Sequence, residues 1–125
     1  MSATQGWAPS KDAAPLFAAL GDPTRLKLVV RLCDGGPQSI TRLTTGSDFT
    51  RQAITKHLRV LADAGVVRGV RSGQESRWEV EPARLEVARR YLDLMSQRWD
   101  ERLSALAQQL EEPAEGAKAL RRRKR

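Results

Sequence analysis

Apolar residues recur every three or four positions along most of the chain, and this spacing predicts a mainly helical fold. The first helix is expected from Ala13 to Leu20, with Asp12 as its N-cap and Pro15 in its first turn. A second helix should follow Asp22, which suits an N-cap because Pro23 then takes the first helical position. The side chains expected on its buried face are Leu26, Val29, Val30 and Cys33.

A pair of helices joined by a tight turn is predicted in the middle of the chain. A short helix is expected within residues 39–45, followed by a turn over residues 46–49. Thr50 is a good N-cap for the second helix of the pair, which should run to Ala64 and stop at Gly65. One face of this helix is apolar and carries Ile54, Leu58 and Leu61.

A hairpin and one long helix complete the predicted elements. Residues 66–71 and 76–80 are β-prone and flank the turn residues 72–75. Pro82 opens a helix that meets no breaker before Pro113, and thirty residues of helix span about 45 Å. Its apolar stripe outruns any core that so small a domain can offer, which predicts pairing with a second copy. The stripe comprises Leu85, Ala88, Leu92, Met95, Trp99, Leu103, Leu106 and Leu110.

This order of elements is that of a winged helix-turn-helix, with five helices and a two-stranded β-wing. We predict a flexible arm over residues 1–11, a DNA-binding and dimerisation domain over 12–112, and a disordered basic tail over 113–125. Aromatic residues make up only 5% of the 125, which suits an aliphatic, helical core. No apolar run approaches the roughly 20 residues of a membrane span, and no signal-peptide pattern opens the chain, so a cytoplasmic location is expected.

The net charge of +7 is unevenly distributed. Residues 118–125 hold six of the 22 basic side chains and no acid, so the rest of the chain is nearly neutral. Within residues 1–117, the segment 51–84 carries seven basic and four acidic side chains, whereas the segment 86–115 carries seven acidic side chains and four arginines. The first of these regions suits a phosphate backbone and the second does not. The basic tail either adds salt-sensitive affinity or is simply solvated.

The polar face of the second helix of the pair carries side chains that suit DNA recognition. Glutamine pairs with adenine and arginine with guanine, whereas hydroxyls and lysine suit base edges and phosphates. On the helix these residues are Thr50, Arg51, Gln52, Thr55, Lys56 and Arg59. The hairpin adds Arg68, Arg71, Gln74 and Arg77 as candidate backbone or minor-groove contacts. A merely solvated face is the alternative, but the order of elements favours DNA binding.

Two motifs resemble the ArsR/SmtB family of winged-helix repressors: residues 20–26 (LGDPTRL) and residues 51–61 (RQAITKHLRVL). The resemblance covers most of the chain, roughly residues 13–112. It implies a homodimer that binds an imperfect palindrome overlapping a promoter, and it places the six helix residues named above against DNA. It also implies dimer contacts through the first and last helices, and we assign these to Leu16, Phe17, Leu92, Met95, Trp99, Leu103 and Leu106.

The chain departs from the family pattern at two places. Asp48 stands in the turn where glycine is common, and the turn can survive this change because aspartate tolerates a left-handed backbone better than most residues. The cysteine pair and the histidines that hold metal in sensing members are missing, since the chain has one cysteine and one histidine. We therefore expect no metal site and no cofactor.

Several residues allow two interpretations. Cys33 is expected to be a buried structural thiol, with an exposed redox switch as the alternative. His57 should pack at the inner edge of its helix, with proton sensing as the alternative. Trp78, Tyr91 and Trp99 should pack in the hairpin and the dimer seam, although an effector pocket could use them.

Taken with the absence of a catalytic constellation, these features predict a regulator and not an enzyme. The expected function is sequence-specific binding of double-stranded DNA by a homodimer that represses transcription, including that of its own gene. The alternative is a winged-helix protein-interaction module that does not read DNA. The sequence identifies no effector ligand.

Overall fold

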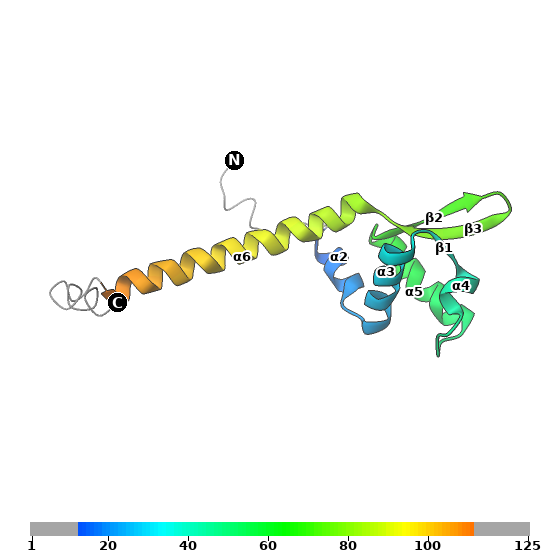
Figure 1. Cartoon of the computed structure of the whole chain (residues 1–125), viewed down its shortest axis with the longest axis horizontal. Coiled ribbons are helices and arrows are strands. Elements are labelled where there is room, and N and C mark those ends of the chain that lie inside the picture. Colours follow the sequence, from blue (N-terminus) through cyan, green and yellow to red (C-terminus); the bar gives the residue numbers. More distant parts are fainter. Residues whose placement is uncertain (1–12, 112–125) are drawn as a thin grey trace. The chain divides into compact units, whose positions relative to one another are not determined.

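Five helices and three short strands make up residues 13–111, the part of the chain that the computed structural model describes (Figure 1). They confirm the predicted mainly α winged helix-turn-helix. The N-terminal arm, the Asp12 cap and the basic tail lie outside the described residues. The elements are α2 (Ala13–Leu20), α3 (Pro23–Gly35), β1 (Gln38–Ser39), α4 (Ile40–Thr44), α5 (Arg51–Asp63), β2 (Val67–Ser72), β3 (Glu75–Val80) and α6 (Pro82–Glu111).

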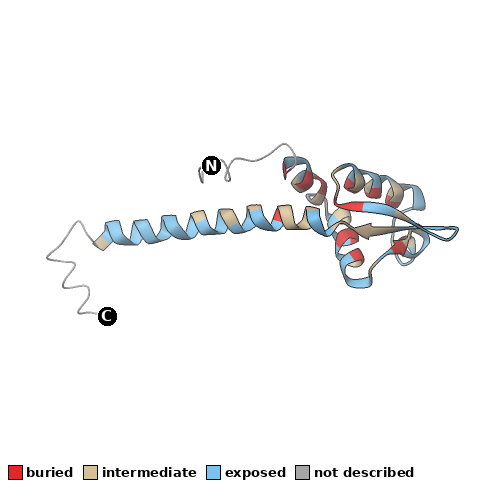
Figure 2. Cartoon of the chain, turned by 90° about the horizontal axis from the view of Figure 1, so that it is seen from above, coloured by how far each residue is buried: buried red, intermediate tan, exposed pale blue. Residues whose placement is uncertain are grey.

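The chain divides after Arg89 into two compact units. The first unit holds α2 to α5, the sheet and the beginning of α6, and it contains every buried residue among those described (Figure 2). The second unit comprises the rest of α6, where no described side chain is buried. None of the helices within residues 13–111 is long and apolar enough to cross a membrane.

The core of the first unit is aliphatic, as the composition predicts. Helix α5 packs against α2, α3, α4 and β2, so its apolar face lies at the centre of this core. Val66, Val67 and Ala88 close the core from the sheet and from the start of α6. The other buried members are Leu16, Ala19, Leu28, Val29, Leu32, Leu43, Ile54, Leu58 and Leu61.

The predicted buried face of α3 is wrong in part. Val29 is buried, but Leu26 and Val30 are about half exposed (49% and 51%), and Cys33 is also exposed. Leu28 and Leu32 occupy the core positions instead. Helix α3 carries two apolar stripes that overlap, so periodicity alone does not decide which of them meets α5. The prediction that Cys33 is a buried thiol is therefore wrong, because Cys33 lies on the exposed side of α3.

The sheet has one strand more than predicted. Its order is β1-β3-β2, all antiparallel, with Gln38 opposite Trp78. Strands β2 and β3 form the wing, and Ser72 pairs with Glu75 across a two-residue turn. Gly73 has φ +65° at the first turn position, a conformation that glycine adopts at no steric cost. Gln38 is buried, and its side-chain amide donates to the carbonyl of Arg31 at 2.9 Å, which anchors β1 to α3.

The motif of residues 20–26 performs two structural tasks. The Asp22 carboxylate caps α3, accepting hydrogen bonds from the backbone N–H groups of Thr24 (2.9 Å) and Arg25 (3.0 Å). The Arg25 guanidinium donates to the carbonyl of Ala19 at 2.6 Å, and it lies 3.4 Å from Nδ1 of His57. Arg25 therefore ties the end of α2 to α5.

Asp22 makes the stability of this region depend on pH. The backbone N–H of Arg25, the Arg25 charge and the N–H of Thr24 together lower the pKa of the Asp22 carboxyl against some desolvation. The carboxylate therefore stabilises the fold fully above its ordinary pKa of about 3.9, and this contribution is lost as pH falls through the lower folded pKa. We expect Asp22→Asn to lower the melting temperature at pH 7 and to match the wild type in strong acid. An equal difference at both pH values would contradict the cap's charge dependence.

Gly65 ends α5 with φ +81°, where a Cβ would lie 3.0 Å from Nε and 3.2 Å from Cγ of Arg84. The left-handed backbone alone costs a non-glycine residue about 1–2 kcal/mol. We expect Gly65→Ala to lower the free energy of unfolding by at least this amount, measured by urea denaturation. Gly46→Ala is the matched control, because Gly46 has φ +78° and no atom within 4 Å of its Cβ position. Equal losses in the two variants would show that Arg84 adds no crowding.

Candidate nucleic-acid interface

Helix α5 presents one buried and one exposed face, as its sequence predicts. Ile54, Leu58 and Leu61 are at most 1% exposed. Thr50 caps the helix, because its hydroxyl accepts a hydrogen bond from the N–H of Ala53 at 3.1 Å. We call the opposite side the outer face of α5; it lines a shallow depression and comprises Arg51, Gln52, Thr55, Lys56 and Arg59.

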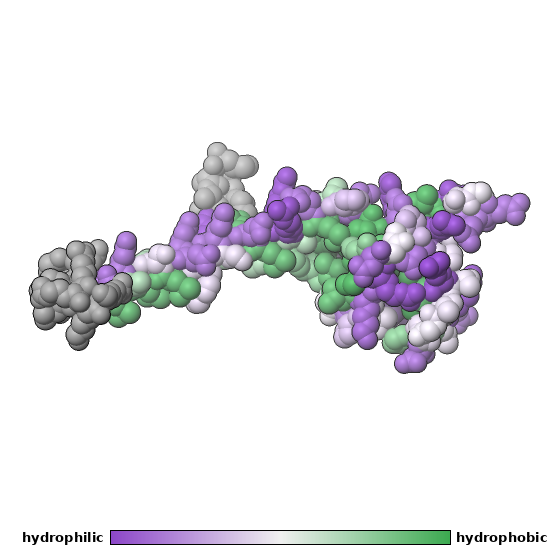
Figure 3. All heavy atoms as spheres, viewed as in Figure 1, coloured by the Kyte–Doolittle hydropathy of each residue, from purple (hydrophilic) through white to green (hydrophobic). Residues whose placement is uncertain are grey.

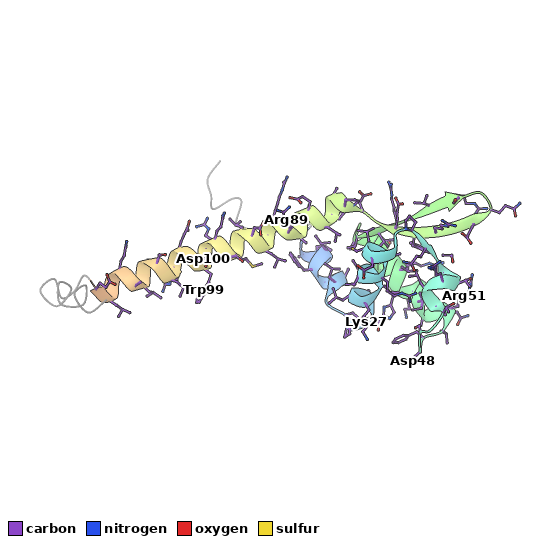
Figure 4. The ribbon with its side chains drawn as sticks, viewed as in Figure 1. Lys27, Asp48, Arg51, Arg89, Trp99 and Asp100 are labelled. Atoms are coloured by element: carbon purple, nitrogen blue, oxygen red, sulfur yellow. The ribbon has the colours of Figure 1, made fainter. Side chains whose placement is uncertain are left out.

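Local hydrogen bonds set what the outer face offers to a ligand. The Thr55 hydroxyl donates to the carbonyl of Arg51 at 2.8 Å, so its oxygen is oriented as an acceptor. Arg51 is labelled in Figure 4. Its guanidinium donates to Oγ1 of Thr41 on α4 at 2.8 Å. Gln52, Lys56 and Arg59 are exposed. The outer face carries three cations and no acid, and it begins at a helix N-terminus, where the dipole favours phosphate.

The four wing residues predicted to contact DNA do not share one face. Cross-strand partners lie on the same side of the sheet, so Arg71 and Ser76 lie on the side of Trp78. Trp78 packs against the core, so this side faces the helices. A groove there brings Gln74 at the wing tip together with Arg51 of α5. Arg68 and Arg77 lie on the other side.

Arg68 and Arg77 are also neutralised by neighbouring carboxylates. The Arg68 guanidinium contacts Glu79 at 2.6 Å and Glu81 at 3.6 Å. The hydrogen bond to Glu79, with the charges of both acids, raises the pKa of Arg68. Arg77 pairs with Glu75 at 2.7 Å. Arg71 and Gln74 are therefore better placed for a DNA contact than Arg68 and Arg77, and contact of all four residues with DNA stays a prediction.

Helix α4 brings further polar groups beside α5 that the sequence analysis did not select. Thr41 and Arg42 are exposed, and Thr41 lines the same groove as Gln74. The Arg31 guanidinium fixes α4 from α3 by donating to the carbonyls of Leu43 (2.8 Å) and Arg42 (3.0 Å). The sequence does show hydroxyl and basic residues on the short helix predicted within residues 39–45. It does not show which way their side chains point.

His57 packs at the inner edge of α5, as predicted. It is half-buried, and its ring meets that of Phe49 edge to face with centroids 6.2 Å apart. Nδ1 of His57 is the atom that Arg25 approaches. These contacts link the turn before α5 with the end of α2, which gives His57 a structural role.

The α6 stripe, which comprises Leu92, Met95, Trp99, Leu103, Leu106 and Leu110, is exposed in the single chain. Trp99 is 60% exposed and projects from the helix (Figure 4). Figure 3 shows apolar side chains along one edge of α6 and hydrophilic ones along the other. Phe17 is half-buried, but Leu16 has no exposed surface. The assignment of Leu16 to a dimer contact is therefore corrected: it belongs to the chain's own core.

Comparisons with known proteins place this geometry in a family. A family model described as a helix-turn-helix domain matches residues 20–70. The uncharacterized HTH-type transcriptional regulator YuzN of Bacillus subtilis is 44% identical over 71 residues, which cover 52% of this chain and 75% of YuzN. The ArsR-like transcriptional regulator from Rhodococcus sp. RHA1 superposes with a TM-score of 0.68 at 36% identity, covering 86% of this chain and 95% of its own.

The chain belongs to the ArsR family of transcriptional regulators. This confirms the resemblance that the two sequence motifs indicated, and with it a DNA-binding, winged-helix regulator. A homodimeric winged helix-turn-helix DNA-binding domain from Mycobacterium bovis has the same fold, with a TM-score of 0.54 at 23% identity. These relatives are transcriptional regulators and not enzymes.

The chain departs from the ArsR pattern in the turn around Asp48 and in the residues that hold metal in sensing members. The turn forms without a left-handed Asp48, because Gly46 supplies its positive φ (+78°), and no non-glycine residue among those described has a positive φ. The turn is instead closed by the N–H of Phe49, which donates to the Ser47 hydroxyl at 3.0 Å. Within residues 13–111, no three histidine, cysteine or acidic side chains gather as a metal site would require.

Proposed function

We propose that this ArsR-family chain binds an inverted-repeat operator as a homodimer and represses transcription, including that of its own gene. The outer face of α5 is the observation that carries the proposal. Its side chains can read bases and phosphates, and its buried face holds the helix firmly on the core. We assign base contacts to Arg51, Gln52 and Arg59, and phosphate contacts to Thr50, Lys56 and Arg71.

The α6 stripe supports the homodimer. Six large apolar side chains, each at least 39% exposed, lie three or four residues apart on one helix. Such a stripe on a helix without a partner favours association with an identical helix. Two-fold symmetry then requires two half-sites that are inverted and separated by about one turn of DNA or a multiple of it.

Repression follows from occupancy, because a dimer seated on a promoter excludes polymerase from the same DNA. A reporter fused to the DNA upstream of the chain's own gene tests this. We expect the wild-type chain to lower reporter expression and the double variant Arg51→Ala, Gln52→Ala to leave it unrepressed. A reporter that the wild-type chain does not lower, or raises, would contradict autorepression.

The alternative of a protein-interaction module is less well supported by the outer face of α5. A protein-docking helix is expected to expose apolar side chains at its centre. Here the five residues of the outer face are polar or cationic, and the exposed apolar residues lie beside it (Phe49 in the preceding turn and Val60 on α5) or on α3 and α6.

A further inference from the structure

We propose that Thr41 on α4 is a positioning residue that sets the base preference of Arg51. The inference rests on the proposed function, because it names a determinant of specificity within the same DNA-binding surface. Neither sequence motif contains Thr41, and its side chain was not among the predicted contacts. Its relevance comes from one bond across two elements, in which Arg51 Nη1 donates to Thr41 Oγ1 at 2.8 Å.

Several hydrogen bonds hold α4, the helix that carries the acceptor Thr41 Oγ1. Ser39 caps α4, since its hydroxyl accepts from the N–H of Arg42 at 3.2 Å. Both the N–H and the hydroxyl of Thr45 donate to the Thr41 carbonyl, at 3.1 and 2.8 Å. Arg31 holds the other end of α4 to α3 through two carbonyls. Three sets of bonds therefore hold the backbone of α4 around Thr41, and none of them uses the Thr41 hydroxyl.

The bond to Thr41 restricts the conformation of the Arg51 side chain. Arg51 is exposed and opens α5 immediately after the Thr50 cap, and among residues 13–111 Thr41 is the one hydrogen-bond partner of its guanidinium. A guanidinium has five N–H donors, and the bond to Thr41 uses one of them. The remaining N–H of Nη1 and those of Nη2 can still form the paired hydrogen bonds by which arginine recognises guanine O6 and N7.

The bond therefore orients the side chain without consuming its capacity to read a base. Ordering a flexible side chain at an interface costs about 0.5–1.5 kcal/mol, so a pre-ordered Arg51 should discriminate its base about two- to tenfold better than a free one. Thr41 also lines the groove that contains Gln74, where a DNA backbone could pass, so direct contact of the hydroxyl with phosphate is the competing explanation.

The test uses the full chain and the duplex that the wild type enriches from a randomised DNA pool. Each base pair of that duplex is changed in turn, and dissociation constants are measured for wild type, Thr41→Val, Thr41→Ser, Arg51→Ala and the double variant Thr41→Val, Arg51→Ala. The base pair read by Arg51 is the one at which Arg51→Ala no longer discriminates. Valine keeps the shape and β-branching of threonine, and serine keeps the hydroxyl.

We expect Thr41→Val to lose about two- to tenfold of discrimination at that one base pair and none elsewhere, with Thr41→Ser restoring it. In the Arg51→Ala background, Thr41→Val should have no further effect. A loss that is equal for all sequences and persists without Arg51 would overturn the inference in favour of a phosphate contact. Unchanged discrimination in Thr41→Val would also overturn it, while the proposed function would stand. If the wild type enriches no sequence, the proposed function itself fails.

Discussion

Replacing Trp99 and Leu103 together by glutamate is expected to abolish the dimer and, with it, tight operator binding. The two side chains are 60% and 45% exposed in the single chain and lie at the centre of the α6 stripe. In a two-fold dimer the change would bring four carboxylates into an apolar seam, where each carries a desolvation penalty. Neither residue contributes to the core of the first unit, so the fold of the DNA-binding unit should survive.

The expected loss of operator affinity is large, because a monomer engages only one half-site. Linking two binding modules raises avidity by about 10²–10⁴, and this gain should disappear. Sedimentation velocity measures the oligomeric state, and fluorescence anisotropy with a two-half-site duplex measures affinity. Gln97→Glu combined with Gln108→Glu is the matched control, since it adds the same charge at exposed positions on the opposite side of α6. A variant that stays dimeric in the first experiment would show that the stripe is not the seam.

Substitution of Gln52 or Arg59 by alanine is expected to weaken operator binding by about 1–3 kcal/mol each and to relax the preference at one base pair. Both side chains are exposed on the outer face of α5, and their removal leaves the buried face intact. The loss should therefore appear in binding and not in the melting temperature.

Lys56→Ala is the matched comparison for this prediction. A lysine that contacts phosphate contributes to all sequences equally, so its removal should weaken binding uniformly and reduce the slope of log K against log salt by about 1. If Gln52→Ala and Arg59→Ala behaved in the same uniform way, the assignment of base contacts to them would be wrong.

The sequence predicted the elements well because their signals are local. Asp22, Thr50 and Gly65 mark helix ends through caps and a left-handed glycine, and the structure confirms all three. The apolar face of α5 is also a local pattern, with a single stripe and no competitor. The outer face of α5 then follows, because the opposite side of a docked helix must meet solvent.

The sequence failed where a choice depends on distant partners. On α3 the two overlapping stripes are equally helical, and only the packing of α5 selects Leu28 and Leu32 over Leu26 and Val30. Strand β1 has two residues and exists because β3 offers it a free edge. The ion pairs of Arg68 depend on cross-strand register, which a one-residue shift would change.

Selection of duplexes from a randomised pool by the purified chain, at near-physiological salt, tests the central claim most directly. The account predicts enrichment of an inverted repeat whose half-sites lie about one helical turn, or a multiple of it, apart. The Trp99→Glu, Leu103→Glu variant should not enrich this repeat. Absence of any enriched sequence, together with binding that vanishes as salt rises, would contradict sequence-specific recognition by a dimer and leave only non-specific attraction to the basic chain.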